Sequence, residues 1–178
     1  MKNLKFLLIL SLAITVFSCK KNDDTAASSN ADLVGTWTLT TLTGTATGNA
    51  VDSSTMTTQA FTGVITGKNI TATASFTENP NNVAGAGTYD IDLVATATTG
   101  GGTQTVSQTG QKIIDNSPAT WTRVATLLTI LDGTETLTGT VNISGNTMTV
   151  VTTSPLNIVD GTVTSTGTSN VTQTYTKQ

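Results

Sequence analysis

The sequence predicts an all-β domain, built as an antiparallel up-and-down β-barrel, and three observations carry this prediction. Apolar and polar residues alternate with a period of two along most of the chain, as they do in half-buried strands. About a quarter of the residues are Thr, whose branched side chain favours a pleated surface. Clusters of Gly, Asn and Asp interrupt the alternation at short intervals, which is typical of antiparallel sandwiches and barrels. A closed barrel leaves no sheet edge exposed, so we expect the barrel and keep a β-sandwich as the alternative.

The folded part is expected to begin with a short helical turn at residues 30–34, with Asn30 as its cap. The first strand follows at 35–42, where Trp37 and every second residue after it share one face. Residues 44–55 are rich in Gly, Asn, Asp and Ser, and this composition predicts a loop.

The later elements follow from the same alternation and from the turn residues between them. The remaining strands are expected at 59–66, 70–77, 88–98, 103–109, 119–131, 135–143, 147–153 and 170–177. Turns are expected at 67–69, 79–82, 99–102, 132–133 and 144–146. Residues 119–131 are more continuously apolar than the other segments, which predicts one strand covered on both faces. The polar Gly, Ser and Thr stretch at 154–169 predicts a connection before the closing strand.

The chain begins with a secretory signal. A short basic start precedes a largely apolar run of about a dozen residues at 6–17, too short for a membrane span, which needs about 20 apolar residues. Its end, Val16-Phe17-Ser18-Cys19, resembles the lipobox of bacterial lipoproteins, and the resemblance implies that Cys19 becomes the acylated N-terminus. Cys19 is the only cysteine of the chain, so it forms no internal disulfide.

The expected organisation is a signal peptide at 1–18, a flexible tether at 19–30 and one domain at 31–178. The lipobox resemblance implies a diacylglyceryl group and an amide-linked chain such as palmitate on Cys19, and two or more acyl chains anchor a protein stably to a membrane. The pair Asp23-Asp24 is similar to the acidic signal that sends some Gram-negative lipoproteins to the outer face of the outer membrane, and it equally fits a solvated linker. We expect an outer-membrane lipoprotein that faces the periplasm or the cell surface.

Charge and residue types exclude several classes of function. The chain carries 8 Lys and Arg against 11 Asp and Glu, so it has no basic stripe for nucleic acid. It contains no His, which removes His-based triads and most zinc and copper sites. Asp90 and Asp92 share a strand face opposite the apolar one, so we expect them to be solvated. Glu135 occupies a position in the alternation that otherwise carries apolar residues. We therefore expect it either inside the barrel or at its rim. We expect no enzyme activity, metal or cofactor.

Three segments resemble bacterial lipocalin-like lipoproteins. They are the Gly-x-Trp opening at 33–39, the hairpin segment at 143–150 and the last strand at 171–177. The resemblance implies a lipocalin-like barrel in which Trp37 closes one end. It also implies that a basic residue, Lys177 or Arg123, packs over the tryptophan.

Eight large side chains are expected to point into the barrel, where they pack the core or contact a ligand: Trp37, Leu39, Phe61, Ile65, Phe76, Tyr89, Ile91 and Met148. Many other inward positions carry small residues, which leave volume unfilled: Ala72, Ala74, Ala95, Ala97 and Gly139. An eight-stranded barrel can hold one small ligand in such volume. We therefore expect a lipid-anchored module that binds a small apolar ligand. The alternative is a structural or adhesive surface lipoprotein with a packed core, and the sequence does not identify a protein partner.

Overall fold

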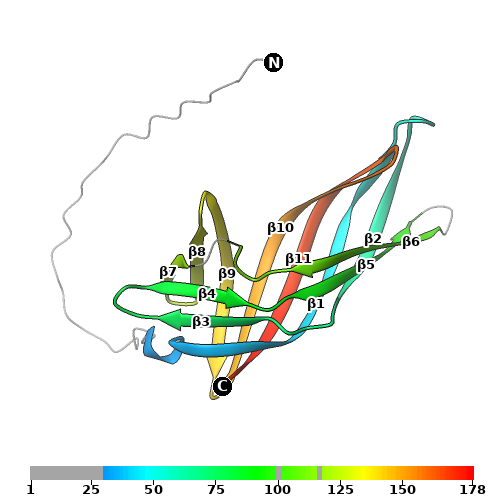
Figure 1. Cartoon of the computed structure of the whole chain (residues 1–178). Coiled ribbons are helices and arrows are strands. Elements are labelled where there is room, and N and C mark those ends of the chain that lie inside the picture. The colour runs from blue at the N-terminus through cyan, green and yellow to red at the C-terminus, as the bar shows by residue number, and fades with distance from the viewer. Residues whose placement is uncertain (1–29, 99–101, 116–117) are drawn as a thin grey trace, which may run out of the picture.

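The structure is a computed structural model that describes residues 30–98, 102–115 and 118–178. The expected signal peptide at 1–18, the acylation site Cys19 and the tether up to residue 29 lie outside the described residues. The described part contains one short 3-10 helix, η1 (Asn30–Asp32), at the expected position and is otherwise built of strands (Figure 1).

Eleven strands are described, and every pairing between them is antiparallel. They are β1 (Gly35–Asp52), β2 (Thr57–Lys68), β3 (Thr73–Thr77), β4 (Asn82–Ala86), β5 (Tyr89–Ala97), β6 (Thr103–Gln111), β7 (Ala119–Val124), β8 (Leu127–Asp132), β9 (Glu135–Ser144), β10 (Thr147–Asp160) and β11 (Val163–Lys177). The all-β prediction is confirmed.

Eight of these strands close into a barrel in the order β11-β10-β9-β8-β7-β4-β3-β1, because β11 pairs back with β1. This closing ladder runs from the pair Trp37–Lys177 to the pair Asp52–Val163, with one irregularity after Leu39. The predicted antiparallel barrel is therefore confirmed, and the alternative sandwich is wrong. Strands β2, β5 and β6 extend the sheet outward from β1.

The three outer strands continue the paths of three barrel strands. β2 pairs with the second half of β1 and β3 with its beginning, so β2 and β3 run along β1 one after the other in the same direction. In the same way β5 follows β4 along β2 and β3, and β6 and β7 lie beside β5 and β4. At one end of the molecule eight strands close into a ring, which we call the closed half. At the other end the sheet is open, in the order β6-β5-β2-β1-β11-β10, and we call this the open half. Its edge strands β6 and β10 do not pair with each other in the described chain.

Backbone geometry explains where these paths break. The hairpin turn expected at 67–69 is wrong, because β2 ends at Lys68 and the chain continues in the same direction into β3. Asn69 has a positive φ of 48°, which kinks the strand instead of reversing it. Gly87 separates β4 from β5 with φ 69°, and a Cβ there would overlap the carbonyl of Thr71.

Three other expected elements are wrong for related reasons. The loop expected at 44–55 is the outer part of β1, which continues to Asp52. The single strand expected at 119–131 is the β7–β8 hairpin, which turns next to Ala125, a residue with a positive φ of 53°. The connection expected at 154–169 belongs to β10 and β11, which pair on both sides of a turn containing Gly161.

Trp37 is buried near the start of β1, just after the short helix η1. Its side chain is fully buried, and its indole N–H donates a hydrogen bond of 2.8 Å to the Leu33 carbonyl. The Lys177 ammonium lies 5.1 Å from the centre of the Trp37 ring, within the range of a cation–π contact. Of the two basic candidates, Lys177 is therefore the one over the tryptophan. Arg123 instead pairs with Asp32 at 2.6 Å.

The Asp52 carboxylate joins the β1–β2 turn to the β10–β11 turn. Its Oδ1 accepts hydrogen bonds from the Ser54 hydroxyl at 2.7 Å, the Ser54 amide at 2.9 Å and the Thr162 hydroxyl at 2.9 Å. These hydrogen bonds, that of the Ser54 hydroxyl foremost, lower the pKa of Asp52 from 3.8 to about 2.

We expect the Asp52 carboxyl group to titrate near pH 2 in the folded protein. Because its folded pKa lies below the unfolded value of 3.8, the ionised carboxylate stabilises the native state above pH 3.8. That contribution disappears as the pH falls from 3.8 to about 2. A carboxyl-carbon NMR titration measures the midpoint, and the Asp52→Asn variant identifies its signal. A midpoint at 3.8 would contradict the described bonds.

Candidate functional site: a cavity where the barrel opens

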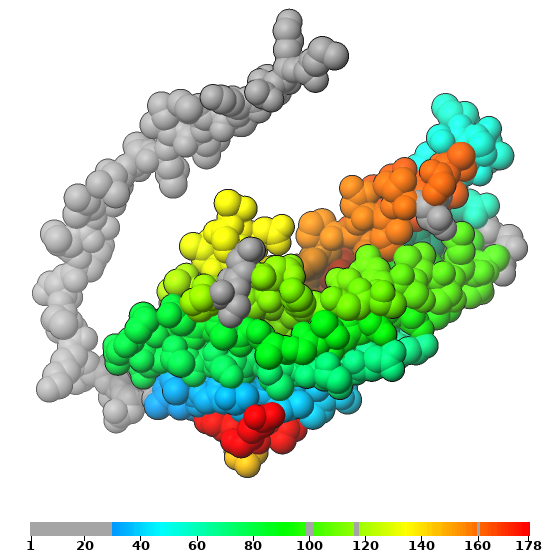
Figure 2. Space-filling model, viewed as in Figure 1, coloured from blue at the N-terminus to red at the C-terminus, as the bar shows by residue number. Residues whose placement is uncertain are grey.

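The barrel opens where β9 separates from β10. β9 pairs with β10 only from Thr140 to Ser144, and β10 then continues to Asp160 with β11 as its partner. The β8–β9 hairpin ends at the turn next to Gly133, well before the end of β10. Figure 2 shows the resulting hollow between the yellow hairpin, the orange β10 and the green strands.

A cavity of about 460 Å³ lies inside this opening, within the size range of small-molecule sites. Strands β3, β8, β9, β10 and β11 line it together with the start of β5 and the segment 112–115. Its apolar lining consists mainly of Ala74, Phe76, Ile113, Leu128, Ile130, Leu137, Met148 and Val150. Ten polar or charged side chains, mostly Thr and acidic residues, also belong to the lining. The cavity is therefore partly apolar and partly polar, and it reaches the surface beside the β8–β9 hairpin.

Small residues account for the free volume and for the shape of the opening. Ala74 is buried and faces the cavity, where a larger side chain would occupy the space. Gly139 lies where β9 leaves β10, and a Cβ there would come within 2.9 Å of Val150 Cγ1 and 3.0 Å of Thr152 Cγ2. Glycine at this point thus lets β9 approach β10 closely before the two strands separate.

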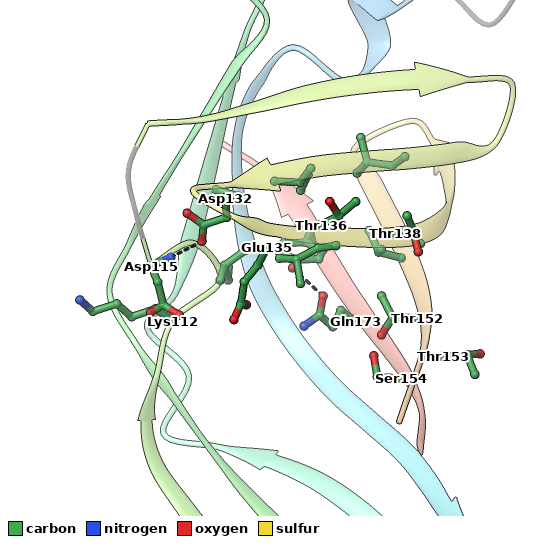
Figure 3. Close-up of a pocket in the computed structure, with 18 of the residues that line it drawn as sticks. Lys112, Asp115, Asp132, Glu135, Thr136, Thr138, Thr152, Thr153, Ser154 and Gln173 are labelled. Atoms are coloured by element: carbon green, nitrogen blue, oxygen red, sulfur yellow. Dashed lines mark hydrogen bonds between the residues drawn. The ribbon is translucent and has the colours of Figure 1, made fainter. Parts of the chain in front are cut away.

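Charged side chains gather at one side of the rim. Figure 3 shows Lys112, Asp115, Asp132 and Glu135 there, on the 112–115 segment and at the tip of the β8–β9 hairpin. Asp132 is almost fully buried and accepts the Asp115 backbone N–H at 2.7 Å through Oδ2. Glu135 is exposed, so it lies at the rim and not inside the barrel. Three carboxylates and one ammonium give this side of the opening a negative balance.

Two tyrosines supply polar groups to the apolar wall. The Tyr175 hydroxyl donates a hydrogen bond of 2.9 Å to Gln173 Oε1, and burial raises the pKa of Tyr175, with Tyr89 adding to the shift. Burial, then the negative charge of Asp115, raises the pKa of Tyr89. Both hydroxyls therefore stay neutral at physiological pH, and Tyr89 presents a donor near the acidic rim.

The eight residues expected inside the barrel are distributed between the closed half and the open half. Phe76, Tyr89 and Met148 line the cavity, whereas Trp37 and Leu39 are buried in the core without lining it. In the open half, three residues have different surroundings: Phe61 lines a second cavity of about 360 Å³, Ile65 is buried and Ile91 is half-buried. That any of them contacts a ligand stays a prediction.

The small residues expected inside follow the same division. Ala72 is buried in the core, Ala74 and Gly139 line the main cavity, and Ala95 and Ala97 line the second one. The segment 112–115, which lines the cavity, was not predicted from the sequence. Its signal was the apolar pair Ile113-Ile114 in an otherwise polar stretch.

Asp90 and Asp92 hold strands together. Asp90 accepts hydrogen bonds from the Asn69 amide at 2.7 Å and from the Gly110 backbone at 2.9 Å, and these bonds lower its pKa. Asp92 pairs with Lys68, which lowers its pKa most, and accepts the Ser107 hydroxyl at 2.8 Å. Both carboxylates thus link β5 to β2 and β6. No group of three or more metal-ligating side chains occurs in the described part of the chain.

Comparisons of this chain with protein-family models, with curated proteins and with solved structures found no match. Over residues 30–98, 102–115 and 118–178, no helix has the length and the apolar character needed to cross a membrane. The geometry of the molecule itself, a closed eight-strand antiparallel barrel with a partly apolar cavity at its opening, is thus the basis for a function.

Proposed function

We propose that this protein is a lipid-anchored lipoprotein of the bacterial cell envelope whose lipocalin-like barrel binds a small apolar molecule. The observation that carries the binding function is the cavity of about 460 Å³, whose lining includes eight apolar side chains. The lipobox-like end of the signal peptide and the lone Cys19 support the anchor. The Gly-x-Trp opening, with Lys177 over Trp37, supports the lipocalin-like assignment.

The cavity favours ligand binding over the alternative of a structural or adhesive protein with a packed core. Protein interiors are close-packed, and voids larger than a water molecule are few. The apolar part of an unfilled chamber loses packing contacts that a purely structural domain would keep. A ligand restores those contacts when it binds.

The rim selects the ligand's polar end. Asp115, Asp132 and Glu135 outnumber Lys112 around the opening, and like charges raise the free energy of an anionic group placed there. A molecule with a neutral or cationic end therefore fits better than a fatty acid with its carboxylate. Its apolar body would lie between Phe76 and Met148.

The Leu137→Trp variant should bind an apolar probe at least tenfold more weakly than the parent. Leu137 lines the cavity near its mouth and is 41 % exposed, so an indole there fills the entrance without disturbing the packed core. A neutral fluorescent probe of naphthalene type, titrated against the protein, gives the dissociation constant. Among the amine, neutral and carboxylate versions of the probe, we expect the carboxylate version to bind most weakly.

Leu131→Trp is the matched control. Leu131 lies on the same hairpin and is 48 % exposed, but it does not line the cavity. We expect this variant to keep the parent affinity and both variants to melt near the parent temperature. Equal loss of affinity in both variants, or no saturable binding by the parent, would refute binding in this cavity.

A further inference from the structure

Strand β6 is an unprotected sheet edge. In the described part of the chain it pairs with β5 alone, and its nine residues include neither a charge nor a proline. Both of its faces are open to solvent, with Val106 and Gln111 as its half-buried residues. Natural sheets normally block such an edge with Lys, Pro or a bulge, because free backbone groups invite pairing with another strand.

The backbone groups of β6 point outward at alternate residues. The Ala97 N–H donates a hydrogen bond of 2.9 Å to the Gly102 carbonyl, which directs Gly102 toward β5. The ladder continues in register from Thr96–Thr103 to Asp92–Ser107. Because antiparallel pairs alternate in their hydrogen bonding, the N–H and C=O groups of Thr103, Thr105 and Ser107 face away from β5.

The other edge of the open half is protected. There β10 carries Pro155, which has no N–H to donate, opposite Thr168 of β11. β6 has no proline, and its one irregularity in the ladder lies near its end, between Gln108 and Gln111. Side chains also hold β6 in place: Ser107 is bonded to Asp92, and the Gly110 backbone to Asp90. The free edge is therefore fixed in position.

We propose that β6 pairs with β6 of a second copy of this chain, antiparallel, about a two-fold axis at Val106. Around this axis the sequence is self-complementary. The pairs across the interface would be Val106–Val106, Thr105–Ser107, Gln104–Gln108 and Thr103–Thr109. Each pair joins residues of like polarity, and none places like charges opposite one another.

This register also satisfies the backbone. Thr105 of one copy and Ser107 of the other form hydrogen-bonded pairs on either side of the axis, because their free groups face outward. An isologous contact of this kind closes after two copies and generates no fibre. The dimer would join two open halves into one continuous sheet. It leaves the proposed ligand cavity untouched, because no residue of β6 lines that cavity.

A charge-reversal experiment tests the dimer. The full-length parent chain in a non-ionic detergent should sediment with the mass of two chains, after correction for bound detergent. Val106→Lys alone and Val106→Glu alone should each sediment as one chain, because two like charges would meet at the axis. An equal mixture of the two variants should recover the two-chain species. A monomeric parent, or a mixture that stays monomeric while both variants melt like the parent, would overturn the proposal.

Cysteine trapping tests the register. Val106 faces Val106 of the second copy, so Val106→Cys should cross-link to a covalent dimer under mild oxidation. The parent measures any background from Cys19. Val159→Cys lies on the other edge strand, β10, and is 69 % exposed in the parent, so it provides a matched position outside the interface. A higher dimer yield from Val159→Cys than from Val106→Cys would overturn the proposal.

Discussion

The Trp37→Ala variant should lose about 3–5 kcal/mol of unfolding free energy, the range for truncating a buried aromatic side chain. Trp37 is fully buried, its indole N–H is bonded to the Leu33 carbonyl, and Lys177 lies over its ring. Truncation removes all three interactions and leaves a cavity that the surrounding strands cannot fill. Since a small domain is stable by about 5–15 kcal/mol, this loss is a large fraction of the total. Chemical denaturation followed by circular dichroism measures it.

Two further variants serve as comparisons for the stability loss of Trp37→Ala. Lys177→Met removes the charge over the ring, and we expect it to cost about 0.5–2 kcal/mol. Val124→Ala, at a side chain that is 74 % exposed, should change stability by less than about 0.5 kcal/mol. If Trp37→Ala unfolds at the same denaturant concentration as Val124→Ala, the described packing of the tryptophan in the core is wrong.

The Gly48→Ala variant should lose about 3 kcal/mol or more, at the upper end of the cost of overpacking. Gly48 of β1 pairs with Gly167 of β11 in the ladder that closes the barrel. A Cβ on Gly48 would overlap the Thr166 carbonyl oxygen and come within 2.8 Å of Gly167 Cα. Both are backbone atoms, which no rotamer change can move aside, so β1 and β11 must separate locally.

Gly167→Ala should cost a similar amount, since its Cβ would overlap the Thr47 carbonyl in the same way. The double variant should then lose less than the sum, because the two substitutions open the same contact. Gly102→Ala is the matched control, since a Cβ there has no atom within 4 Å. A Gly48→Ala protein as stable as Gly102→Ala would show that β1 and β11 do not approach as described.

Period-two alternation identified the strands wherever a conventional turn bounded them. The strand expected at 135–143 matches β9 closely, and the turns on either side contain Gly133 and Gly145 with positive φ. Such turns depend on local residue preferences, so the residue types at the turn predict them. A basic residue over Trp37 was likewise predictable from the Gly-x-Trp opening, although the choice of Lys177 over Arg123 was not.

The errors arose where glycine or alanine plays a part that composition does not reveal. The glycines of β1 read as loop residues, but Gly48 allows a close approach of two strands within a regular ladder. The β7–β8 turn contains Ala125 in a left-handed conformation that alanine seldom adopts. Kinks such as that at Asn69 depend on neighbouring strands and have no reliable local signal.

The cavity could be predicted only in part for the same reason. Parity placed Met148 and Ala74 inside the barrel, and both line the cavity. The opening itself results from unequal strand lengths, because β10 continues beyond the point where β9 leaves it. The acidic rim brings Asp115 next to Asp132 across a sequence separation of 17 residues. These features depend on contacts between distant parts of the chain. The alternation of residues along a single strand cannot predict such contacts.

The most direct test of the whole account is a crystal structure of the protein grown with a brominated, neutral aromatic ligand. We expect β1 paired with β11, and an anomalous bromine peak inside the barrel among Phe76, Met148 and Tyr175. Side chains filling that space, bromine confined to the outer surface, or an unpaired β1 would contradict it.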